Sequence, residues 1–550
     1  MSKIIKDPIY GYIEIEDCYA SIVDSPFFQR LRDIIQTSYV SVYPASLHNR
    51  FTHSLGVFYL GKKASDYVLE DFKNVYKEFY ESNIEEIEVI HNTFILACLL
   101  HDVGHSPFSH TGEKFFFEKV KDGTYLIWLL LLDIVADEKF SRDANTLPGA
   151  PHEIMSAYIS LKYLIGTRQE EPRLKIDKSL FARSIIGLKY ADSDEISSLK
   201  NCFIDLLNSQ TIDTDRLDYL IRDSYMSGYN SANIDYERLL SAISIKNKNG
   251  QYKIIFNKKA LSVLENAILA HDEEKKWIQS HPTILYESFL IEGMIRFAVN
   301  EFKKGGVELF SAEALTKDGI KKGKENIRLL SDSDIISFAK RFGFKYKFVQ
   351  SYFDRSKRLK LLWKSEAEYK AIIESKFSSV KGGNLLSMEE YFAKKINPFL
   401  LTQDDEFVPV INDKTLRYFN AQLKKAREGE NNFYIENRLK ALEQIVFLIK
   451  KLKALSKLFD VPFEYVFISN GQFMSGFNKE NFKNIKIDFP NLERTYEIQD
   501  VVNVLGSEER RDQFFYFYVP KELKDKKIKD VISEVINIFL SFSQEFLENK

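Results

Sequence analysis

Residues 92–110 read NTFILACLLHDVGHSPFSH, and this stretch decides the fold class. Its first part, Asn92 to Leu100, is apolar on every face, which predicts a central buried helix. We expect Gly104 to end that helix in the left-handed conformation. Ser106-Pro107 then fits the N-cap and first turn of a second helix that runs through Phe117. The histidines of this stretch would therefore lie around a tight corner between two helices.

Outside this corner, apolar residues recur mostly at helical spacing. An early stretch, Ile4 to Ile15, is β-prone around a proline and a glycine and predicts a short hairpin. Late in the chain, Asn437 to Leu458 and Ile528 to Leu547 are amphipathic, and Phe463 to Ile468 is β-prone. We therefore predict a mainly α protein: a helical core with a short N-terminal β-hairpin and a smaller mixed α/β, mostly helical C-terminal part.

The length of 550 residues exceeds what one hydrophobic core usually serves, so we expect more than one structural unit. We predict a core over residues 1–300, with an apolar insertion at about 118–151. A lysine- and glycine-rich connection follows at 301–330. The mostly helical region 331–550 would serve oligomerisation or regulation.

The composition, 45% hydrophobic and 28% charged with a net charge of −2, is typical of a soluble globular protein. The three cysteines are far apart and in no CxxC spacing, which argues against disulfides and a thiolate zinc site and favours the cytoplasm. The longest apolar run, Tyr125 to Leu132, is shorter than the roughly 20 residues of a membrane-spanning helix. Membrane association is not expected, and the lysine-rich connection lacks the interleaved aromatic residues that would indicate nucleic-acid binding.

Four side chains have the composition of a catalytic divalent-metal site: His53, His101, Asp102 and Asp215. Such an ion needs several imidazole or carboxylate ligands, with positions left open for water and substrate. A single His-Asp dipeptide is usually structural, but several histidines crowd this corner in a chain that has only 9. The sequence therefore predicts a divalent metal ion, with magnesium, manganese, iron and zinc all open.

Several strings resemble, in this order, the deoxynucleoside triphosphate triphosphohydrolases of the HD superfamily. They are HNRFTHSLGV (His48 to Val57), LLHDVGHSPFSH (Leu99 to His110), His152-Glu153 and DTDRLDYLIRD (Asp213 to Asp223). The resemblance covers roughly residues 3 to 240. It implies an HD-domain phosphohydrolase that cleaves deoxynucleoside triphosphates to deoxynucleoside and inorganic triphosphate.

The resemblance also assigns roles to individual residues. It makes His53, His101, Asp102 and Asp215 the metal ligands. It implies a catalytic group of His105, His110, Glu113 and His152, in which His110 is our candidate general acid. It implies a substrate-binding group of Gln36, Arg50, Arg216, Tyr219 and Asp223.

Two residues depart from the family pattern. Glu113 stands where the family usually has aspartate, and Thr37 stands where it commonly has a bulky leucine that crowds the ribose 2′-hydroxyl. Ribonucleotides therefore stay open as substrates. We interpret Asp218 and Arg222 as an ordinary i, i+4 ion pair.

In the best-known members, nucleotides bind between subunits and promote assembly, so we predict a homo-oligomer, a dimer or tetramer, with substrate nucleotides also as activators. The matching residues are Lys3, Ile4, Asp24, Gln29, Arg32 and Arg238. Each of these is also common on solvated surfaces. Two alternatives remain: a phosphohydrolase for another nucleotide or a nucleic-acid end, and a nucleotide-sensing scaffold. The purpose, nucleotide-pool control or defence against phage, is open.

Overall fold

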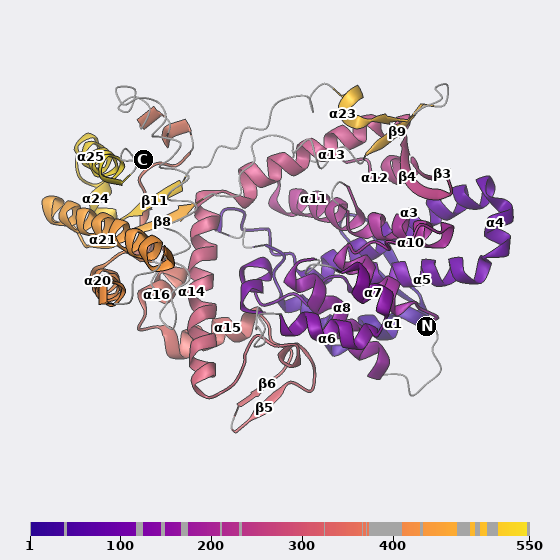
Figure 1. The fold of residues 1–550 in the computed structure, drawn as a ribbon, viewed down its shortest axis with the longest axis horizontal. Coiled ribbons are helices and arrows are strands. Elements are labelled where there is room, and N and C mark those ends of the chain that lie inside the picture. Colours follow the sequence, from indigo (N-terminus) through magenta and orange to yellow (C-terminus); the bar gives the residue numbers. More distant parts are fainter. Residues whose placement is uncertain are drawn as a thin grey trace. The chain divides into compact units, whose positions relative to one another are not determined.

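The computed structural model describes the following ranges: 2–37, 41–116, 125–144, 149–166, 174–209, 212–229, 234–323, 325–365, 367–369, 371–372, 410–428, 433–469, 485–489, 495–502 and 515–546. The chain forms two compact units, drawn in Figure 1. Unit 1 comprises 1–279, 298–343 and 476–509, and unit 2 comprises 280–297, 344–475 and 510–550. Each unit is therefore built from three separate stretches of the chain. The boundaries predicted near 300 and 330 divide the chain into consecutive domains instead, and they stay a prediction.

The N-terminal hairpin of unit 1 is confirmed. Strands β1 (Lys3–Asp7) and β2 (Gly11–Ile15) pair antiparallel, with Asp7 opposite Gly11. The φ of +79° at Gly11 lies in the left-handed region, where a residue without Cβ is favoured. The Asp7 carboxylate closes the turn by accepting the backbone N–H groups of Ile9 and Tyr10 at 2.8 and 3.0 Å. This carboxylate also reaches toward the functional site, as described below.

The core of unit 1 is helical, which confirms the expected mainly α class. The apolar segment predicted as a central helix forms most of α5 (Ile84–Leu100), and its residues Phe94 to Leu100 are buried. Helix α5 packs against α3 (Arg50–Val75) and α9 (Lys178–Ile186), and α3 packs against α11 (Thr214–Ser227). The first turns of α3 and α11 and the end of α5 are the positions that carry the candidate metal ligands.

Shorter elements complete unit 1. Its largest sheet has the order β10-β9-β4-β3, in which β9 pairs parallel with β4 and the other pairs are antiparallel. The strands are β3 (Ile243–Lys248), β4 (Gln251–Asn257), β5 (Ile320–Lys322), β6 (Glu325–Ile327), β9 (Lys486–Asp488) and β10 (Tyr496–Glu497). The further helices are α1 (Asp17–Val23), α2 (Pro26–Gln29), α4 (Lys77–Ser82), α6 (Leu126–Val135), α7 (Glu138–Asp143), α8 (Pro151–Gly166), α10 (Glu195–Leu207), α12 (Tyr236–Leu240), α13 (Leu261–Glu273), α15 (Asp332–Phe338) and α23 (Ile498–Val501).

The helix predicted from Ser106 through Phe117 is wrong. Two 3-10 turns, Ser109–Thr111 and Glu113–Phe116, take its place, and Phe117 lies outside the described residues. Phe108 and Ser109 adopt φ values of 58° and 51°, which an α-helix does not accept. The Ser106 hydroxyl donates to the Ser109 carbonyl at 2.7 Å, so a local side-chain bond competes with helical pairing.

The role expected for Gly104 is also wrong. Its φ is not in the left-handed region. A Cβ at this position would instead lie 2.2 Å from the Ser156 nitrogen and 2.6 Å from the Met155 carbonyl carbon, both on α8. The glycine therefore permits close packing between the histidine corner and α8, the helix that carries His152.

Unit 2 combines a small antiparallel sheet with long helices. The sheet has the order β7-β11-β8, from β7 (Lys360–Leu361), β11 (Phe515–Val519) and β8 (Val466–Ser469). Helix α21 (Phe433–Phe459) packs against α20 (Asp413–Glu428) and α25 (Ile528–Phe546). Helices α16 (Lys347–Phe353) and α24 (Lys521–Lys524) and the first part of α14 (Pro282–Lys304) complete it. Within the described ranges, no helix combines the length and apolar character needed to cross a bilayer.

Candidate metal centre and catalytic site

Two capped helices and one helix end position the four predicted metal ligands. The Asn49 side chain caps α3 by accepting the Thr52 N–H at 3.1 Å, which fixes the turn that carries His53. Asp213 caps α11 by accepting the Arg216 N–H at 2.7 Å, which fixes the turn that carries Asp215. His101 and Asp102 follow directly after α5. Three parts of the sequence thus meet at one point.

The four side chains converge. His53 Nε2 lies 3.3 Å from His101 Nε2 and 2.9 Å from the nearer Asp215 oxygen. Asp102 approaches the two rings from another side, with oxygens 3.6 Å from His53 Nε2 and 3.5 Å from His101 Nε2. His53 and Asp102 are buried, whereas 42% of the Asp215 side chain remains accessible. The structure therefore brings together the residues that the sequence predicted as a metal site.

Both histidines have a second partner that fixes the ring. His101 Nδ1 lies 2.9 Å from the Cys98 carbonyl, which can only accept, so Nδ1 carries the hydrogen and the Nε2 of the neutral ring has a lone pair. His53 Nδ1 lies 2.7 Å from Asp218 in the same manner. Partners of this kind orient histidine ligands in metal sites. The donor set and its orientation therefore fit a divalent metal ion.

The electrostatics of the cluster also favour a cation. Burial would raise the pKa of Asp215, but hydrogen bonds from His101 and His53 hold that pKa well below its usual range. Burial works against protonation of His53, but hydrogen bonds to Asp215 and Asp218 raise its pKa to about 10. Asp215 therefore stays ionised and His53 is protonated. A divalent ion would supply the same kind of positive charge between the carboxylates.

Asp218 belongs to a buried network that the sequence did not reveal. The predicted ion pair with Arg222 is present at 2.9 Å, but both residues are buried. Arg222 also pairs with Asp7 at 2.9 Å, and the Tyr10 hydroxyl donates to Asp218 at 2.7 Å. Although burial opposes it, Arg222 and His53 lower the pKa of Asp218 to about 2. The N-terminal hairpin therefore supports the orientation of His53.

Arg50 lies at the edge of the metal cluster and is itself buried. Its Nη1 pairs with Asp102 at 2.7 Å, and its Nε donates to the Ser109 hydroxyl at 3.0 Å. Its Nη2 lies 3.3 Å from both the Gln36 carbonyl and His110 Nε2. One edge of the guanidinium thus holds the ligand Asp102, and the other faces the candidate general acid.

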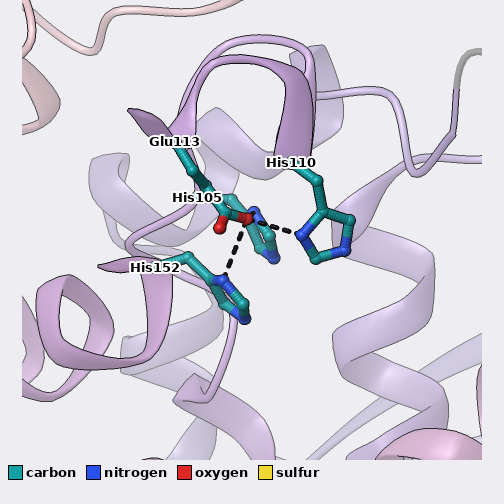
Figure 2. Close-up of side chains that lie close together, drawn as sticks. All are labelled: His105, His110, Glu113 and His152. Atoms are coloured by element: carbon teal, nitrogen blue, oxygen red, sulfur yellow. Dashed lines mark hydrogen bonds and ion pairs between the residues drawn. The ribbon is translucent and has the colours of Figure 1, made fainter. Parts of the chain in front are cut away.

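The candidate catalytic group surrounds one carboxylate. Figure 2 shows the Glu113 carboxylate between His110 and His152, with the His105 ring behind it. Glu113 Oε1 lies 2.6 Å from His110 Nδ1 and 2.9 Å from His152 Nδ1. The His105 ring stacks on His152 with centroids 4.1 Å apart, and its Nε2 lies 3.1 Å from Asp102. His105 therefore links the catalytic group to the metal cluster.

The three histidines of this group differ in charge and exposure. Despite burial, Glu113 raises the pKa of His152 to about 9. Burial and the nearby Arg50 and His152 charges hold the pKa of His105 well below its usual range. Of the His110 side chain, 67% is accessible. At neutral pH His152 is thus cationic and His105 is neutral. Of the three, His110 is the histidine that is open to solvent.

The predicted substrate residues lie near the cluster, with partners that the sequence did not reveal. Arg216 and Tyr219 share one face of α11 after Asp215, and their side chains are hydrogen-bonded to each other. Asp223, expected to accept a sugar hydroxyl, is buried and lies 2.6 Å from His48 Nε2. His48 lies in the same HNRFTH string as His53. That position was the sequence signal that could have marked His48 as part of the site.

The predicted regulatory residues lie on several elements. Lys3 on β1 forms an ion pair with Asp24. Arg32 Nε donates to Gln29 at 2.7 Å, and its guanidinium lies 3.7 Å from the centre of the Phe51 ring. Arg238 on α12 donates to the Lys259 carbonyl at 2.9 Å. Ile4 is 68% exposed. Lys3 and Ile4 thus present one edge of the hairpin to solvent.

Comparisons with known proteins agree with the motif order. Residues 50–168 match the HD domain family. An uncharacterized protein of Methanocaldococcus jannaschii is 25% identical over 478 residues, which cover 84% of this chain and 88% of that protein. Deoxynucleoside triphosphate triphosphohydrolase SAMHD1 of Gallus gallus is 32% identical over 240 residues, 43% of this chain and 36% of that protein. The chain spans about half the length of three other curated relatives.

A solved structure also shares the fold. The crystal structure of a hypothetical protein from Aquifex aeolicus superposes with a TM-score of 0.53, covering 97% of this chain and 100% of that one. At 17% identity this likeness concerns the fold alone. The sequence matches bear out the resemblance that the motifs indicated.

Proposed function

Because the chain carries an HD domain over residues 50–168, we propose that it is a metal-dependent phosphohydrolase that converts deoxynucleoside triphosphates to deoxynucleoside and inorganic triphosphate. The observation that carries this proposal is the convergence of two oriented imidazoles and two carboxylates beside Arg50 and the Glu113 histidine group. A divalent ion held by His53, His101, Asp102 and Asp215 would make phosphorus more electrophilic and a water molecule more acidic.

The residues around the cluster support the remaining steps. Arg50 keeps its pair with Asp102 through Nη1 and offers Nη2 to an oxygen of the α-phosphate. As water forms a bond to phosphorus and loses a proton to solvent, the bond between phosphorus and the 5′-oxygen breaks, and its electron pair stays on that oxygen. His110 Nε2 delivers a proton to that oxygen while Nδ1 donates to Glu113. The products are a deoxynucleoside and inorganic triphosphate.

Arg216 and Tyr219 are proposed to bind the substrate beyond the reacting phosphate. The side chain of Arg216 is mostly buried, and nearby carboxylate and tyrosine groups raise its pKa, so it stays cationic. Such a cation suits a triphosphate tail. Asp223 would accept the sugar 3′-hydroxyl through the oxygen that does not face His48.

A panel of deoxynucleoside and ribonucleoside triphosphates with magnesium, manganese or iron tests the proposal. Products are separated by chromatography. We expect inorganic triphosphate and nucleoside as first products, with loss of activity when a chelator removes the metal. Pyrophosphate or free phosphate as the first product contradicts the proposal.

Asp102→Ala separates an enzyme from a nucleotide-sensing scaffold. We expect this variant to lose hydrolysis while it still binds nucleotide, because binding rests largely on other residues. Asp66→Ala is the matched control: Asp66 lies on α3, the helix of His53, with 60% of its side chain exposed. Hydrolysis that persists in Asp102→Ala excludes the proposed centre.

Ribonucleotides are the second candidate substrate class, because of Thr37. Its hydroxyl and the Gln36 side-chain oxygen are buried, and neither has a hydrogen-bond partner among the described residues. A ribose 2′-hydroxyl could pair with either group. The ribonucleotide half of the substrate panel decides between the two classes.

Nucleotide activation of a homo-oligomer is proposed for the exposed hairpin edge and its neighbours. The exposure of Ile4 and the ion pair of Lys3 with Asp24 support a surface that another subunit or a nucleotide covers. Light scattering with and without a second nucleotide tests this. We expect a rise in mass together with activation, and a mass that does not change with nucleotide contradicts it.

A further inference from the structure

A short segment of unit 2 concentrates positive charge and aromatic rings. Residues 344–360 read FKYKFVQSYFDRSKRLK, in which six cationic residues face a single aspartate, a formal charge of +5 in a chain of net charge −2. Five of its residues are aromatic. The segment covers α16, the turn Arg355–Lys357 and the start of β7. We call it the basic aromatic strip.

The rings of the strip are stacked and partly open to solvent. Phe344 is 51% exposed, and its ring lies parallel to that of Phe353 with centroids 6.0 Å apart. Tyr346 and Phe348 stack in the same manner, with centroids 5.6 Å apart. Large exposed apolar groups that cluster in this way commonly mark a binding surface. Their flat faces suit a planar ligand.

Most cations of the strip are exposed, and they surround these rings. The Lys345 ammonium lies 5.2 Å from the centre of the Tyr346 ring, and Lys347 pairs with Glu464 at the surface. Arg358 is different: it is buried and paired with Glu287 at 2.8 Å, so its role is structural. The exposed cations are Lys345, Lys347, Arg355, Lys357 and Lys360.

A pocket adjoins the strip within unit 2. It has a volume of about 180 Å³, and Tyr346, Phe348 and Tyr286 line it together with Lys347, Lys357 and Lys414. A cavity of roughly 150 Å³ accepts a benzene ring, so this pocket has room for one aromatic ring of a ligand. Aromatic rings and ammonium groups thus line the same pocket.

From this geometry we infer that the basic aromatic strip binds single-stranded nucleic acid. The lysines contact backbone phosphates, and unpaired bases stack on Phe344 and enter the aromatic pocket. Combined charge and stacking is the usual basis of single-strand binding without sequence preference. In a duplex the base faces are already covered, so a duplex would use the charges and leave the rings unoccupied.

Fluorescence anisotropy with the full chain tests the inference. The probes are labelled DNA and RNA single strands of about 20 nucleotides, longer than the roughly 4–16 nucleotides of one binding module, and a duplex of equal length. We expect at least one single strand to bind more tightly than the duplex, with an affinity that falls as salt rises. The DNA and RNA arms identify which strand is preferred.

Two sets of variants separate stacking from charge. Phe344→Ala should weaken binding about tenfold or more, and Phe344→Tyr should retain it, because the ring face persists. Lys345→Glu with Lys360→Glu should also weaken binding at least tenfold. Lys450→Glu with Lys457→Glu, on exposed positions of α21, makes the same change in net charge and should leave binding intact. Circular dichroism verifies that each variant is folded, and if the charge variant is not, the Phe344 pair alone decides.

Several results would overturn the inference. These are a duplex that binds as tightly as either strand, an unchanged affinity in Phe344→Ala, or an equal loss in the α21 control. Polyglutamate that competes as well as the single strand at equal charge would instead identify an acidic polypeptide as the ligand. Absence of binding to every probe at low salt would also overturn it.

Discussion

Asp218 Oδ2 lies 2.7 Å from His53 Nδ1, on the edge of the ring opposite Nε2, the nitrogen proposed to bind the metal. The same carboxylate is held by Arg222 and by the Tyr10 hydroxyl. Its negative charge therefore serves two purposes, because it orients the proposed metal ligand His53 and neutralises a buried guanidinium. A substitution at this position should affect metal binding and folding together.

Asp218→Asn should lower metal affinity by about 10- to 100-fold, the usual effect of losing a residue that orients a histidine ligand. It should also lower the free energy of unfolding by roughly 3 kcal/mol, because Asp7 is then the one charged partner left to Arg222 in the part of the chain that the structure describes. Tyr10→Phe is the control: it removes one hydrogen bond to Asp218, costs about 1 kcal/mol, and leaves metal affinity nearly unchanged. Metal titration and urea denaturation measure both, and equal metal affinities in the two variants would contradict the role of Asp218.

Glu113→Gln should reduce activity and change the pH dependence of stability. The pKa of His152 is raised to about 9, so its contribution is complete below its unfolded value and is lost as pH rises through 9. The pKa of Glu113 is lowered, so its contribution is present above its unfolded value and is lost as pH falls. The stability difference between wild type and variant should therefore be largest near pH 5–6 and shrink toward pH 9.

Denaturation of both proteins across this pH range makes the comparison. Glu153→Gln is the control, because Glu153 adjoins His152 in sequence but bonds Asn208 and the Ala150 N–H. A stability difference that grows toward pH 9 would contradict the assigned charges.

Thr37→Leu should shift selectivity toward deoxyribonucleotides. A larger apolar side chain takes the place of a buried hydroxyl that has no hydrogen-bond partner within the described ranges, and it crowds a ribose. We expect kcat/KM for ribonucleotides, relative to deoxyribonucleotides, to fall about tenfold or more. Thr37→Val removes the hydroxyl at nearly constant volume and separates polarity from size. An unchanged ratio in both variants would place the sugar away from Thr37.

Gly104→Ala should destabilise the protein by about 3 kcal/mol or more, because the added Cβ would meet α8 backbone atoms at 2.2 and 2.6 Å. It should also lower activity, since α8 carries His152. Gly250→Ala is a matched control in a hairpin, with a φ of +79° and open space around it, and should cost about 1 kcal/mol. Urea denaturation compares them, and similar losses would show that the close approach at Gly104 is not tight.

The four candidate metal ligands were chosen from their residue types and motif order, and the structure brings them close together. Capping residues fix the helix turns that carry His53 and Asp215. The chemistry of Asp213 and Asn49 fixes those turns locally. His110 and Glu113 were predicted to belong to one catalytic group, and their i, i+3 contact forms in 3-10 turns rather than in the predicted α-helix. Spacing of this kind tolerates a change of helix type.

Partners distant in sequence could not be predicted. Nothing near Asp218 indicates that Tyr10, 208 positions earlier, donates to it, and Asp223 gives no sign of His48. The role of Gly104 was misread because glycine serves both left-handed turns and close helix packing. The basic aromatic strip was not predicted either. Only the lysine-rich connection at 301–330 was considered for nucleic-acid binding, and it lacks the aromatic rings that alternate with charge in the strip.

Strand β4 pairs parallel with β9, a strand that is synthesised much later. Strand β9 begins at Lys486, whereas β4 ends at Asn257, so the ribosome makes 228 residues between the two. Until β9 arrives, the β4 edge has unpaired backbone groups that can recruit another chain. Expression of a fragment that stops before Lys486 leaves this edge unpaired, so such a fragment should aggregate unless it retains the late strand.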